Sequence, residues 1–389
     1  MLKEGLEKEK ILEILEEKLR KDISYDTGSI LGAMCTKPLE LGIEVYMKFV
    51  SKNLGDPGLF LGTAALEKEL ITEIGELFGG KDLIGAFTSG GSEANLIALR
   101  IAKRLRSDIK NPEIVLSKSA HISFDKAADL LGITLRKANL KENYKLDLDH
   151  FKSLINKNTC GVVGIAGTTP LGLVDPIEEI GKLVEEREVF FHVDAAFGGF
   201  VLPFLKILGF QIRNWDFSVK SVDSITADPH KMGMGIIPTG GIFLRDNSIL
   251  NKTGYEIPYL AGGNFRHLHL VGTRPGGTVI AFWAITRALG INGFVQIVKK
   301  CMNNTEYLTK KLKKIEGIRV ICEPEMNIVG ITTESGENIR KLDIKLRERQ
   351  WMVGKFEDLN LLRIVVMPHV QKTHLKRFCD DLESIVNLI

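Results

Sequence analysis

The chain has 389 residues, of which 44% are hydrophobic, 26% charged and 7% aromatic, the composition of a globular protein. Its formal net charge is only +3, with Lys and Arg spread among Asp and Glu, which argues against nucleic acid or an anionic membrane as a partner. The length suits one large domain and a smaller one rather than a single small core.

The cysteines and the N-terminal stretch predict the cellular compartment. The cysteines are odd in number and contain no C-x-x-C pair, which argues against a disulfide framework and against a zinc site. The stretch "MLKEGLEKEKILEILEEKLRKD" lacks the apolar core of a signal peptide, and no run of about 18 apolar residues follows it. We therefore expect a cytoplasmic protein with no metal and no membrane segment. The cysteines are Cys35, Cys160, Cys301, Cys322 and Cys379.

The first predicted elements are two amphipathic helices, over residues 6–21 and from Leu66 to Leu77, joined through the Gly-rich connector "NLGDPGLFLGT". Strands and helices then alternate: "LIGAFTS", "EIVLSKSAH" and "CGVVGIAGTT" each precede a helical stretch, and "VFFHVDAAFGG" and "VDSITADPHK" follow. The strand-like run "GGIFLR" comes next without an intervening helix. This alternation predicts an α/β fold whose mostly parallel sheet is sandwiched by helices.

The pattern changes after a long helical stretch over residues 278–313. Strand-like "GIRVICEP" and "NIVGITT", a helix over 337–349, the strand "LLRIVVMPHV" and a final helix predict a smaller α+β C-terminal domain. We expect three parts: an N-terminal helical segment over 1–55, a large ligand-binding domain over 56–285 and a small C-terminal domain over 286–389.

In a parallel sheet, ligands bind at the carboxyl ends of the strands, and unusual residues gather there. The turn "TSGGSEAN" places two glycines and a serine where a strand meets a helix, so that free backbone N–H groups and a hydroxyl face one spot. The turn matches neither G-x-x-x-x-G-K-[ST] nor G-x-G-x-x-G. It predicts a phosphate site, although a Gly-rich turn with a serine cap is an alternative.

The next strand ends supply His121 in "KSAHISF", Thr168 and its neighbour in "AGTTPLG", and the acid of "FHVDAAFGG". His192 and Asp194 lie two residues apart and therefore share one face of a strand. Burying Asp194 is costly unless it meets a cation, and the small residues after it leave room for a flat group. The alternatives are a capped surface histidine for His121 and a helix cap or buried ion pair for Asp194.

Lys231, in "SITADPHKMG", follows another buried strand. A lysine kept in an apolar pocket is a nucleophile that forms a Schiff base with an aldehyde. A phosphate cradle, an acid for a ring nitrogen, a residue to stack on the ring and a Schiff-base lysine together predict a site for pyridoxal 5'-phosphate.

The order of "SGGSEAN", "AGTT-LG", "HVDAAFGGF", "DSIT-DPHKMG" and "GTRPGG" resembles the group II pyridoxal-phosphate decarboxylases of fold type I. Within that group, the sequence is most similar to the archaeal L-tyrosine/L-aspartate decarboxylases. The resemblance covers almost the whole chain, from "NLGDPGLF" to "LRIVVMPHV". It implies the fold type I pyridoxal-phosphate transferase fold, a pyridoxal phosphate cofactor and removal of carbon dioxide from an amino acid.

The resemblance also implies roles for single residues. Lys231 would bind the cofactor aldehyde, Asp194 would pair with the ring nitrogen, and His121 would stack on the ring opposite Ala196. Further cofactor contacts would come from the turn around Gly91 and from a loop of the second subunit, because this family builds its sites at a homodimer interface. These contacts comprise Gly90, Gly91, Ser92, Thr168 and His230, together with Gly272 and Thr273 from the partner.

Four positions are less directly implied. Asp228 stands where related aromatic decarboxylases have an asparagine near the phosphate, and we leave it out of the phosphate site because an acid beside a phosphate is unfavourable. The loop "LAGGNFRHLHLVG" lacks the tyrosine that animal and plant relatives use to return the proton, so His267 or His269 is the candidate acid. Arg363 is the candidate clamp for the substrate carboxylate, with a surface ion pair as the alternative.

The substrate is left open between L-aspartate, whose product β-alanine serves coenzyme A synthesis, L-tyrosine, whose product tyramine serves methanofuran synthesis, and L-glutamate. A carbon–carbon lyase resembling sphingosine-phosphate lyase is the alternative within the cofactor class. An aminotransferase or cysteine desulfurase would show a different lysine context. A non-catalytic relative is disfavoured by the presence of Lys231, Asp194 and His121 together.

Overall fold

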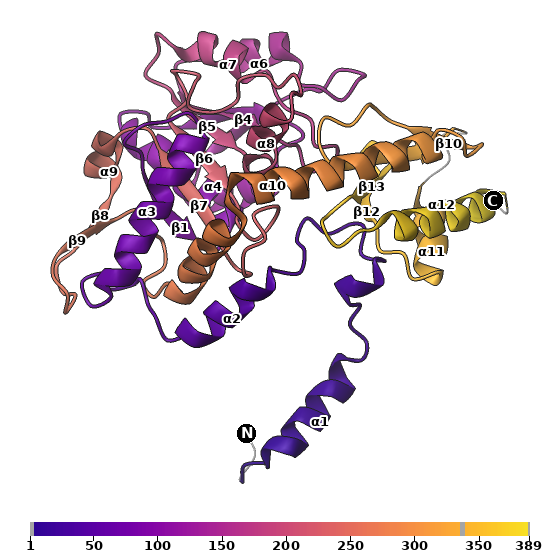
Figure 1. The fold of residues 1–389 in the computed structure, drawn as a ribbon. Helices are drawn as coiled ribbons and strands as arrows, with labels where there is room; N and C mark the ends of the chain where they lie inside the picture. Colours follow the sequence, from indigo (N-terminus) through magenta and orange to yellow (C-terminus); the bar gives the residue numbers. More distant parts are fainter. Residues whose placement is uncertain (1–3, 335–338, 388–389) are drawn as a thin grey trace.

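The computed structural model describes residues 4–334 and 339–387, and its largest unit is a seven-stranded sheet with strand order β1-β7-β6-β5-β4-β2-β3 (Figure 1). The four pairings among β2 to β6 are parallel, whereas β7 runs antiparallel to both β1 and β6. The antiparallel pair arises where no helix separates two strands, because a parallel pair needs a long crossover. The strands are β1 (Ile84–Thr88), β2 (Glu113–Ser117), β3 (Thr134–Ala138), β4 (Thr159–Ile165), β5 (Phe190–Asp194), β6 (Ser224–Ala227) and β7 (Gly240–Leu244).

Helices lie on both faces of this sheet, so every residue of β2, β4, β5, β6 and β7 is buried. This explains why these strands read as continuous apolar runs rather than as alternating ones. The expected α/β class is confirmed. The strand β3 was not predicted, because it forms the sheet edge and its residues before Ala138 alternate between exposed and half-buried. The helices are α3 (Leu61–Leu77), α4 (Gly91–Leu105), α5 (Ser123–Leu131), α6 (Leu148–Leu154), α7 (Ile177–Val184), α8 (Leu202–Ile207) and α9 (Asn247–Thr253).

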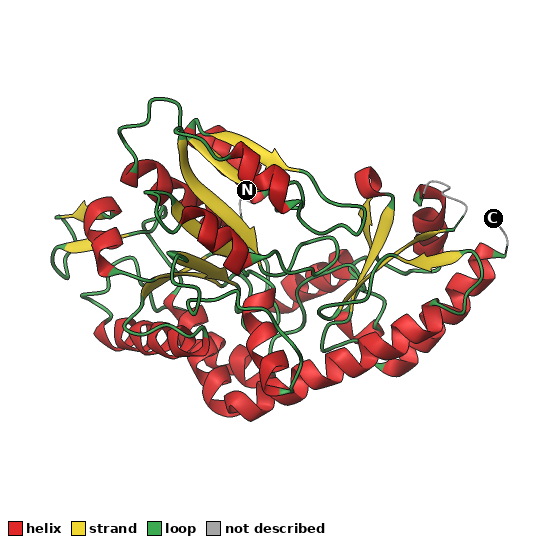
Figure 2. Ribbon diagram, turned by 90° about the horizontal axis from the view of Figure 1, so that it is seen from above, coloured by secondary structure: helices red, strands yellow, loops and turns green. Residues whose placement is uncertain are grey.

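A second, antiparallel sheet with strand order β10-β11-β13-β12 forms the C-terminal part of the chain. Helix α10 (Gly276–Leu312) reaches from the first sheet to the second, as Figure 2 shows from above, and Gly290 interrupts its helical backbone with a φ of 55°. The division of the chain at residue 286 stays a prediction. The other elements are β10 (Ile318–Val320), β11 (Ile328–Thr333), α11 (Arg340–Glu348), β12 (Gly354–Phe356), β13 (Leu361–Val365) and α12 (Lys372–Val386). Part of the helix expected over 337–349 lies outside the described residues.

By length and composition alone, α10 could cross a membrane, and it is the one helix of the described chain that could. A long core helix of a soluble protein has the same features. In this structure α10 packs against α2, α3, α8 and α12, and its buried residues include Phe282, Ile285, Phe294 and Leu308. Its apolar character is therefore accounted for by packing inside the protein.

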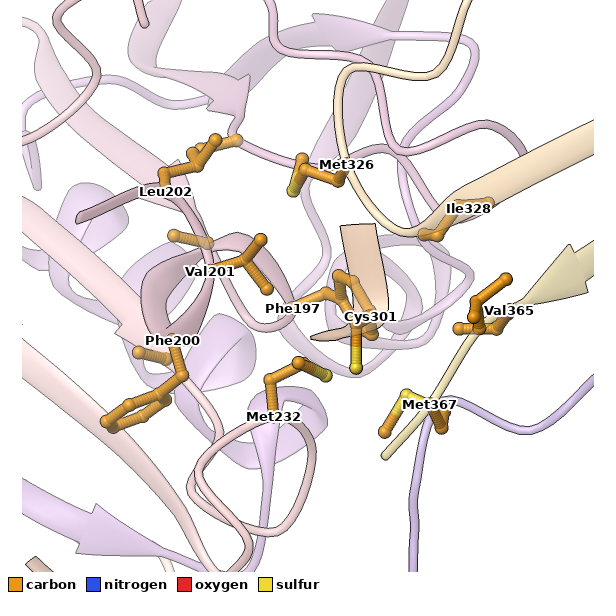
Figure 3. Packing of buried hydrophobic residues seen from close by; sticks show 14 of the residues in the cluster. Phe197, Phe200, Val201, Leu202, Met232, Cys301, Met326, Ile328, Val365 and Met367 are labelled. Atoms are coloured by element: carbon orange, nitrogen blue, oxygen red, sulfur yellow. The ribbon is translucent and has the colours of Figure 1, made fainter. Parts of the chain in front are cut away.

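The apolar core is continuous between the two sheets (Figure 3). Phe197 and Phe200 from the segment after β5 belong to the same cluster as Cys301 of α10 and Val365 of β13. Met232, next to Lys231 in the chain, is fully buried in this cluster. Lys231 is thus adjacent in the chain to a residue that is anchored in the apolar core between the two sheets.

We expect Phe78→Ala to lower the free energy of unfolding by about 3–5 kcal/mol, as removing a buried aromatic ring does. Phe78 is fully buried and packs edge-on against Phe200, Trp215 and Phe243, so no neighbour can refill its space without moving. Phe210 is 45% exposed, and Phe210→Ala is the matched control with an expected change within about 1 kcal/mol. Urea denaturation of the two variants and the wild type measures the difference, and equal losses would contradict it.

The N-terminal part contains two helices of very different environment. Helix α2 (Glu40–Phe49), which the sequence did not predict, packs along α10. Helix α1 (Lys8–Leu19) extends away from the rest of the chain and has no buried residue (Figure 1). Its apolar side chains are largely exposed, and they are Ile11, Leu12, Leu15 and Leu19. The remaining pair of strands is the hairpin of β8 (Tyr255–Ile257) and β9 (Phe265–His267).

Candidate functional site

A cavity of about 470 Å³ lies at the carboxyl ends of the parallel strands, where the second sheet approaches the first. Its walls come from the turn before α4, from the segments after β2, β4, β5 and β6, and from β13. The cavity therefore lies where an open parallel sheet is expected to bind ligands. The sequence-predicted residues in its lining are Gly90, Gly91, Ser92, His121, Asp194, Ala196, His230, Lys231 and Arg363.

Lys231 reaches the cavity on the turn that follows β6. Its Nζ lies 3.1 Å from Oδ2 of Asp228, whose carboxylate is 1% exposed. The other oxygen of this carboxylate, Oδ1, has no hydrogen-bond partner. Asp228, which we left out of the phosphate site, thus lines the cavity and is paired with the lysine. The ammonium group of Lys231 compensates for the burial of this carboxylate, because a buried carboxylate requires a nearby cation or hydrogen-bond donors.

The turn before α4 is shaped for close approach of a ligand. Gly90 has a φ of 148°, a conformation that residues with a side chain rarely adopt. A Cβ on Gly91 would lie 2.9 Å from Oδ2 of Asp228 and 3.1 Å from Cβ of Ala196, so only glycine fits there. The first N–H groups of α4 have no carbonyl partner within the helix. Together with the helix dipole, they form a site for an anion such as phosphate.

Asp194, the last residue of β5, is 6% exposed and is held at both oxygens. Oδ1 accepts a hydrogen bond from the backbone N–H of Ala196 at 3.0 Å, and Oδ2 accepts one from Nδ2 of Asn95 at 3.0 Å. These two donors fix the orientation of the carboxylate, which lines the cavity.

His121 lies on another wall of the cavity, in the segment after β2. Its Nδ1 accepts a hydrogen bond from the backbone N–H of Ser123 at 3.2 Å. Burial lowers the pKa of His121, and the Asp194 carboxylate opposes this effect only in part. The imidazole is therefore uncharged near pH 7, which suits a ring that packs against a flat ligand.

Arg363 of β13 points its guanidinium group into the cavity from the second sheet. Nη1 donates to the carbonyl oxygen of Thr169 at 2.8 Å, and Nη2 donates to that of Gly32 at 2.5 Å. Burial lowers its pKa to about 10, so the group stays positive near pH 7, and its Nε has no partner. An alternative role in a surface ion pair does not apply, because Arg363 is 8% exposed and pairs with no acid among the described residues.

Five sequence-predicted residues lie outside the lining of the cavity. Thr168 is buried, and its Oγ1 accepts a hydrogen bond from the Leu173 N–H at 3.0 Å, so Thr169 lines the cavity instead. The other four lie at the end of β9 and on the segment between β9 and α10: His267, His269, Gly272 and Thr273.

The two histidines of that segment are uncharged near pH 7 in the single chain. Burial lowers the pKa of His267 and, more strongly, that of His269, and the nearby Arg274 lowers both further. Their rings are 5.5 Å apart, and His267 Nε2 and His269 Nδ1 have no hydrogen-bond partner. A residue that returns a proton must carry that proton, so this environment does not suit a general acid.

We expect the free energy of unfolding to decrease as the pH falls from about 6.5 to about 4, because His192 is fully buried on β5. Burial lowers the pKa of His192 to about 4, while the unfolded chain keeps the ordinary value of 6.5. The unfolded state thus binds a proton first, and this group's contribution of about 3 kcal/mol is present above pH 6.5 and lost toward pH 4.

Thermal unfolding of the wild type and His192→Gln at several pH values tests this prediction. The stability advantage of the wild type over the variant should shrink as the pH falls through that window. An advantage that is the same at pH 7 and pH 4.5 would contradict it.

Several residues of the cavity were not singled out from the sequence. Ser89 and Asn95 lie in the quoted motif "TSGGSEAN", and their place in it was the available signal. Thr169 was named with Thr168 at a strand end, but only Thr168 was predicted to contact the cofactor. Met34 comes from the segment before α2 and had no such signal, because only long-range contacts bring it to the cavity.

The residues present fit pyridoxal phosphate. The cradle at Gly90 and Gly91 suits the phosphate, the charged Asp194 suits a protonated ring nitrogen, and Lys231 supplies an amine inside the same cavity. No group of three or more His, Cys, Asp or Glu side chains within residues 4–334 and 339–387 is arranged to hold a metal ion.

Comparisons with known proteins agree with this arrangement. A family model described as "Pyridoxal-dependent decarboxylase conserved domain" matches residues 63–333. The L-aspartate/L-glutamate decarboxylase of Pyrococcus horikoshii is 44% identical over 383 residues, which are 98% of this chain and 98% of that protein. The probable L-tyrosine/L-aspartate decarboxylase of Methanosphaera stadtmanae is 40% identical over 388 residues, covering 99% of each.

Among solved structures, the sphingosine-1-phosphate lyase of Burkholderia pseudomallei matches with a TM-score of 0.92 and 28% sequence identity. The match covers 100% of this chain and 92% of that one. Proteins with this fold therefore include both decarboxylases and a sphingosine-1-phosphate lyase, so the fold alone does not identify the reaction. The side chains that line the cavity must determine it.

Proposed function

Because the chain belongs to the pyridoxal-dependent decarboxylase family, and is thus a pyridoxal-phosphate-dependent amino acid decarboxylase, we propose L-aspartate as its main substrate. L-tyrosine and L-glutamate are the competing substrates. The guanidinium group of Arg363, a buried cation that faces the cavity and pairs with no acid among the described residues, supports an amino acid substrate, since all three candidates carry a carboxylate. Such a group calls for a carboxylate from outside the chain. The 44% identical relative named L-aspartate/L-glutamate decarboxylase supports an acidic substrate.

Each residue of the cavity would have a distinct task. When bound, the pyridine ring of the cofactor takes up the electron pair that departing carbon dioxide leaves. Lys231 would hold the cofactor through its aldehyde until the substrate amine replaces the lysine, and Asp194 would keep the ring nitrogen protonated. Arg363 would orient the substrate through a carboxylate. The backbone of Gly90, Gly91 and Ser92 would hold the phosphate.

The shape of the cavity would support the same chemistry. His121 and Ala196 both line the cavity, where an uncharged imidazole and a methyl group would pack against the faces of the ring and exclude water from them. Exclusion of water strengthens the attraction between the Asp194 carboxylate and a protonated ring nitrogen. His230 would stay fixed, since its Nδ1 lies 2.6 Å from the carbonyl oxygen of Thr239.

Replacing Arg363 by glutamine should raise KM for L-aspartate by about 10- to 100-fold and change kcat less, because a charge-assisted bond to the substrate is lost. The KM of Arg363→Lys should lie between those of the wild type and Arg363→Gln, because lysine keeps the charge but cannot form two parallel hydrogen bonds to a carboxylate. Steady-state rates of carbon dioxide release at pH 7 measure both constants. An unchanged KM in Arg363→Gln would exclude a contact between this residue and the substrate.

The substrate is tested by measuring amine and carbon dioxide release from purified, cofactor-loaded protein with L-aspartate, L-tyrosine and L-glutamate. We expect β-alanine from L-aspartate at the highest kcat/KM. This result would mean that the enzyme supplies β-alanine for coenzyme A synthesis. Tyramine from L-tyrosine alone would overturn the proposal and indicate the methanofuran route. No carbon dioxide from any of the three, with the yellow cofactor bound, would make a carbon–carbon lyase the next activity to test.

We further propose that the enzyme is a cytoplasmic homodimer whose subunits share their active sites. Two observations support a second copy as the partner. Helix α1 exposes a row of apolar side chains and buries none, and exposed apolar residues such as Met47 and Leu61 lie on and after α2. In addition, His267, His269, Gly272 and Thr273 do not line the cavity of their own chain. Gly272 and Thr273 of this segment would reach the phosphate in the cavity of the partner.

Gly272→Val tests the shared site. A Cβ at this position meets no atom within 4 Å in the single chain, so the substitution should not disturb the fold of the subunit. We expect it to weaken cofactor binding, because the position would lie against the partner's phosphate site. Mixing Gly272→Val with Lys231→Ala should then restore about a quarter of the wild-type activity, since half of the random dimers would contain one intact site. Sedimentation as a monomer, or full activity of Gly272→Val, would contradict the shared site.

A further inference from the structure

A chain of buried hydrogen bonds leads from Asp194, through Asn95 in the wall of the cavity, to His192 and Ser224. Nδ2 of Asn95 donates to Asp194 Oδ2 at 3.0 Å, and Oδ1 of Asn95 lies 3.0 Å from Nε2 of His192. On the far side of the imidazole, Nδ1 of His192 lies 2.7 Å from the hydroxyl of Ser224. Asn95, His192 and Ser224 are at most 1% exposed. The chain joins α4, β5 and β6, three elements that meet beside the cavity.

The chemistry of the groups fixes the direction of every hydrogen bond in this chain. A carboxylate only accepts, so the NH₂ of Asn95 faces Asp194 and its carbonyl oxygen faces His192. That oxygen also only accepts, so Nε2 of His192 carries a hydrogen. Burial lowers the pKa of His192 to about 4, so the imidazole is uncharged near pH 7. Its Nδ1 then carries no hydrogen and accepts from the Ser224 hydroxyl.

The second hydrogen of the Asn95 amide extends the chain to His121. Nδ2 of Asn95 also lies 3.0 Å from Oγ of Ser123, and the backbone N–H of Ser123 donates to Nδ1 of His121 at 3.2 Å. One amide group therefore holds two residues of the cavity at once, Asp194 directly and His121 through Ser123. Ser123 is 2% exposed, so water does not compete for these bonds.

We propose that Asn95, oriented by His192 and Ser224, is a positioning residue that keeps the Asp194 carboxylate charged and turned toward the ring nitrogen of the cofactor. The proposal rests on the proposed contact between Asp194 and that nitrogen. Without the Asn95 donor, Oδ2 of Asp194 would lose its hydrogen bond in a buried place. The proton shared between carboxylate and ring nitrogen would then move toward the carboxylate, because hydrogen bonds to an acid favour its charged form. An unprotonated ring is a weaker electron acceptor.

The test is the ¹⁵N chemical shift of the ring nitrogen in protein loaded with ¹⁵N-labelled pyridoxal phosphate, in the absence of substrate. Wild type should give the shift of a protonated ring. Asn95→Leu removes the NH₂ group and the carbonyl oxygen of the side chain and keeps a similar volume. We expect this variant to move the ¹⁵N shift toward the unprotonated value. It should also lower kcat by about 10- to 100-fold and change KM less. Ser224→Ala, at the outer end of the chain, should move the shift in the same direction by less.

Controls separate this role from a purely structural one. Asn327→Ala removes another buried amide, whose Nδ2 donates to the Val366 carbonyl at 3.1 Å, and should lower the melting temperature without moving the ring nitrogen shift. If Asn95→Leu does not fold, Ser224→Ala carries the test alone. A ring nitrogen that stays fully protonated in the folded Asn95 or Ser224 variant would overturn the proposal. Because no substrate is present, this result is independent of which amino acid the enzyme decarboxylates. An unprotonated ring in the wild type would instead refute the contact with Asp194.

Discussion

Lys231→Ala should lose amine formation by about 10³-fold or more, since it removes the only amine placed to bind the cofactor covalently among the described cavity residues. Borohydride should fix pyridoxal phosphate to the wild type as a stable mass increase and should not do so in the variant. Intact-protein mass spectrometry after reduction measures this directly. A variant that still gains the cofactor mass would show that another lysine is used.

The neighbouring acid makes the choice of variant important. Lys231 is the cation 3.1 Å from Asp228, and the alanine variant leaves that buried carboxylate with only His230 Nε2 at 3.9 Å. Some loss of stability is therefore expected from Lys231→Ala itself. Lys231→Arg keeps a cation beside Asp228 but cannot form a Schiff base, so it should be folded and equally inactive. Lys206→Ala, on the exposed surface of α8, is the control that should leave both activity and the mass increase unchanged.

Asp194→Asn is expected to lower kcat by about 10²- to 10³-fold, the cost of removing one preorganised charge from a water-excluded site. The amide keeps the volume of the carboxylate and an acceptor for the Ala196 N–H, so the fold should persist. The amide of the variant carries no negative charge, so it would not stabilise a proton on the ring nitrogen. Steady-state rates with the best substrate give the loss, and the visible spectrum of the bound cofactor should shift as well.

A matched control for this change is Asp223→Asn. Asp223 is a mostly buried carboxylate that accepts a hydrogen bond from the Phe191 N–H at 2.8 Å, at the opposite ends of the same strands. Burial raises its pKa to about 6, so its loss should alter stability and its pH dependence rather than the chemistry. Equal losses of kcat in the two variants would mean that Asp194 acts only through the fold.

The sequence determined the fold class because the relevant information is local. Apolar runs such as β4 and β5 are buried on both faces, and their continuous hydrophobicity predicts that burial without knowledge of their neighbours. The absence of a helix between β6 and β7 likewise predicts that they are antiparallel. Local patterns did not reveal the edge strand β3, whose residues are mostly exposed or half-buried, or helix α2, which packs along α10.

The same distinction applies to the cavity. Residues that end consecutive parallel strands must meet at one edge of the sheet, so the sequence alone could bring together His121, Asp194 and Lys231. It could not show that Asp228 is paired with Lys231, because that depends on how the turn between them folds. Nor could it show that Thr169 rather than Thr168 faces the cavity, since one residue changes the direction of a side chain in an irregular loop.

What only the tertiary structure decided are contacts between segments far apart in the chain. Arg363 reaches the cavity because β13 brings it beside the carbonyl groups of Thr169 and Gly32. Asn95 reaches Asp194 because α4 packs across β5, and it then fixes the tautomer of His192. The physical reason is that hydrogen-bond direction and burial depend on positions in space, whereas the sequence encodes directly only spacing along the chain.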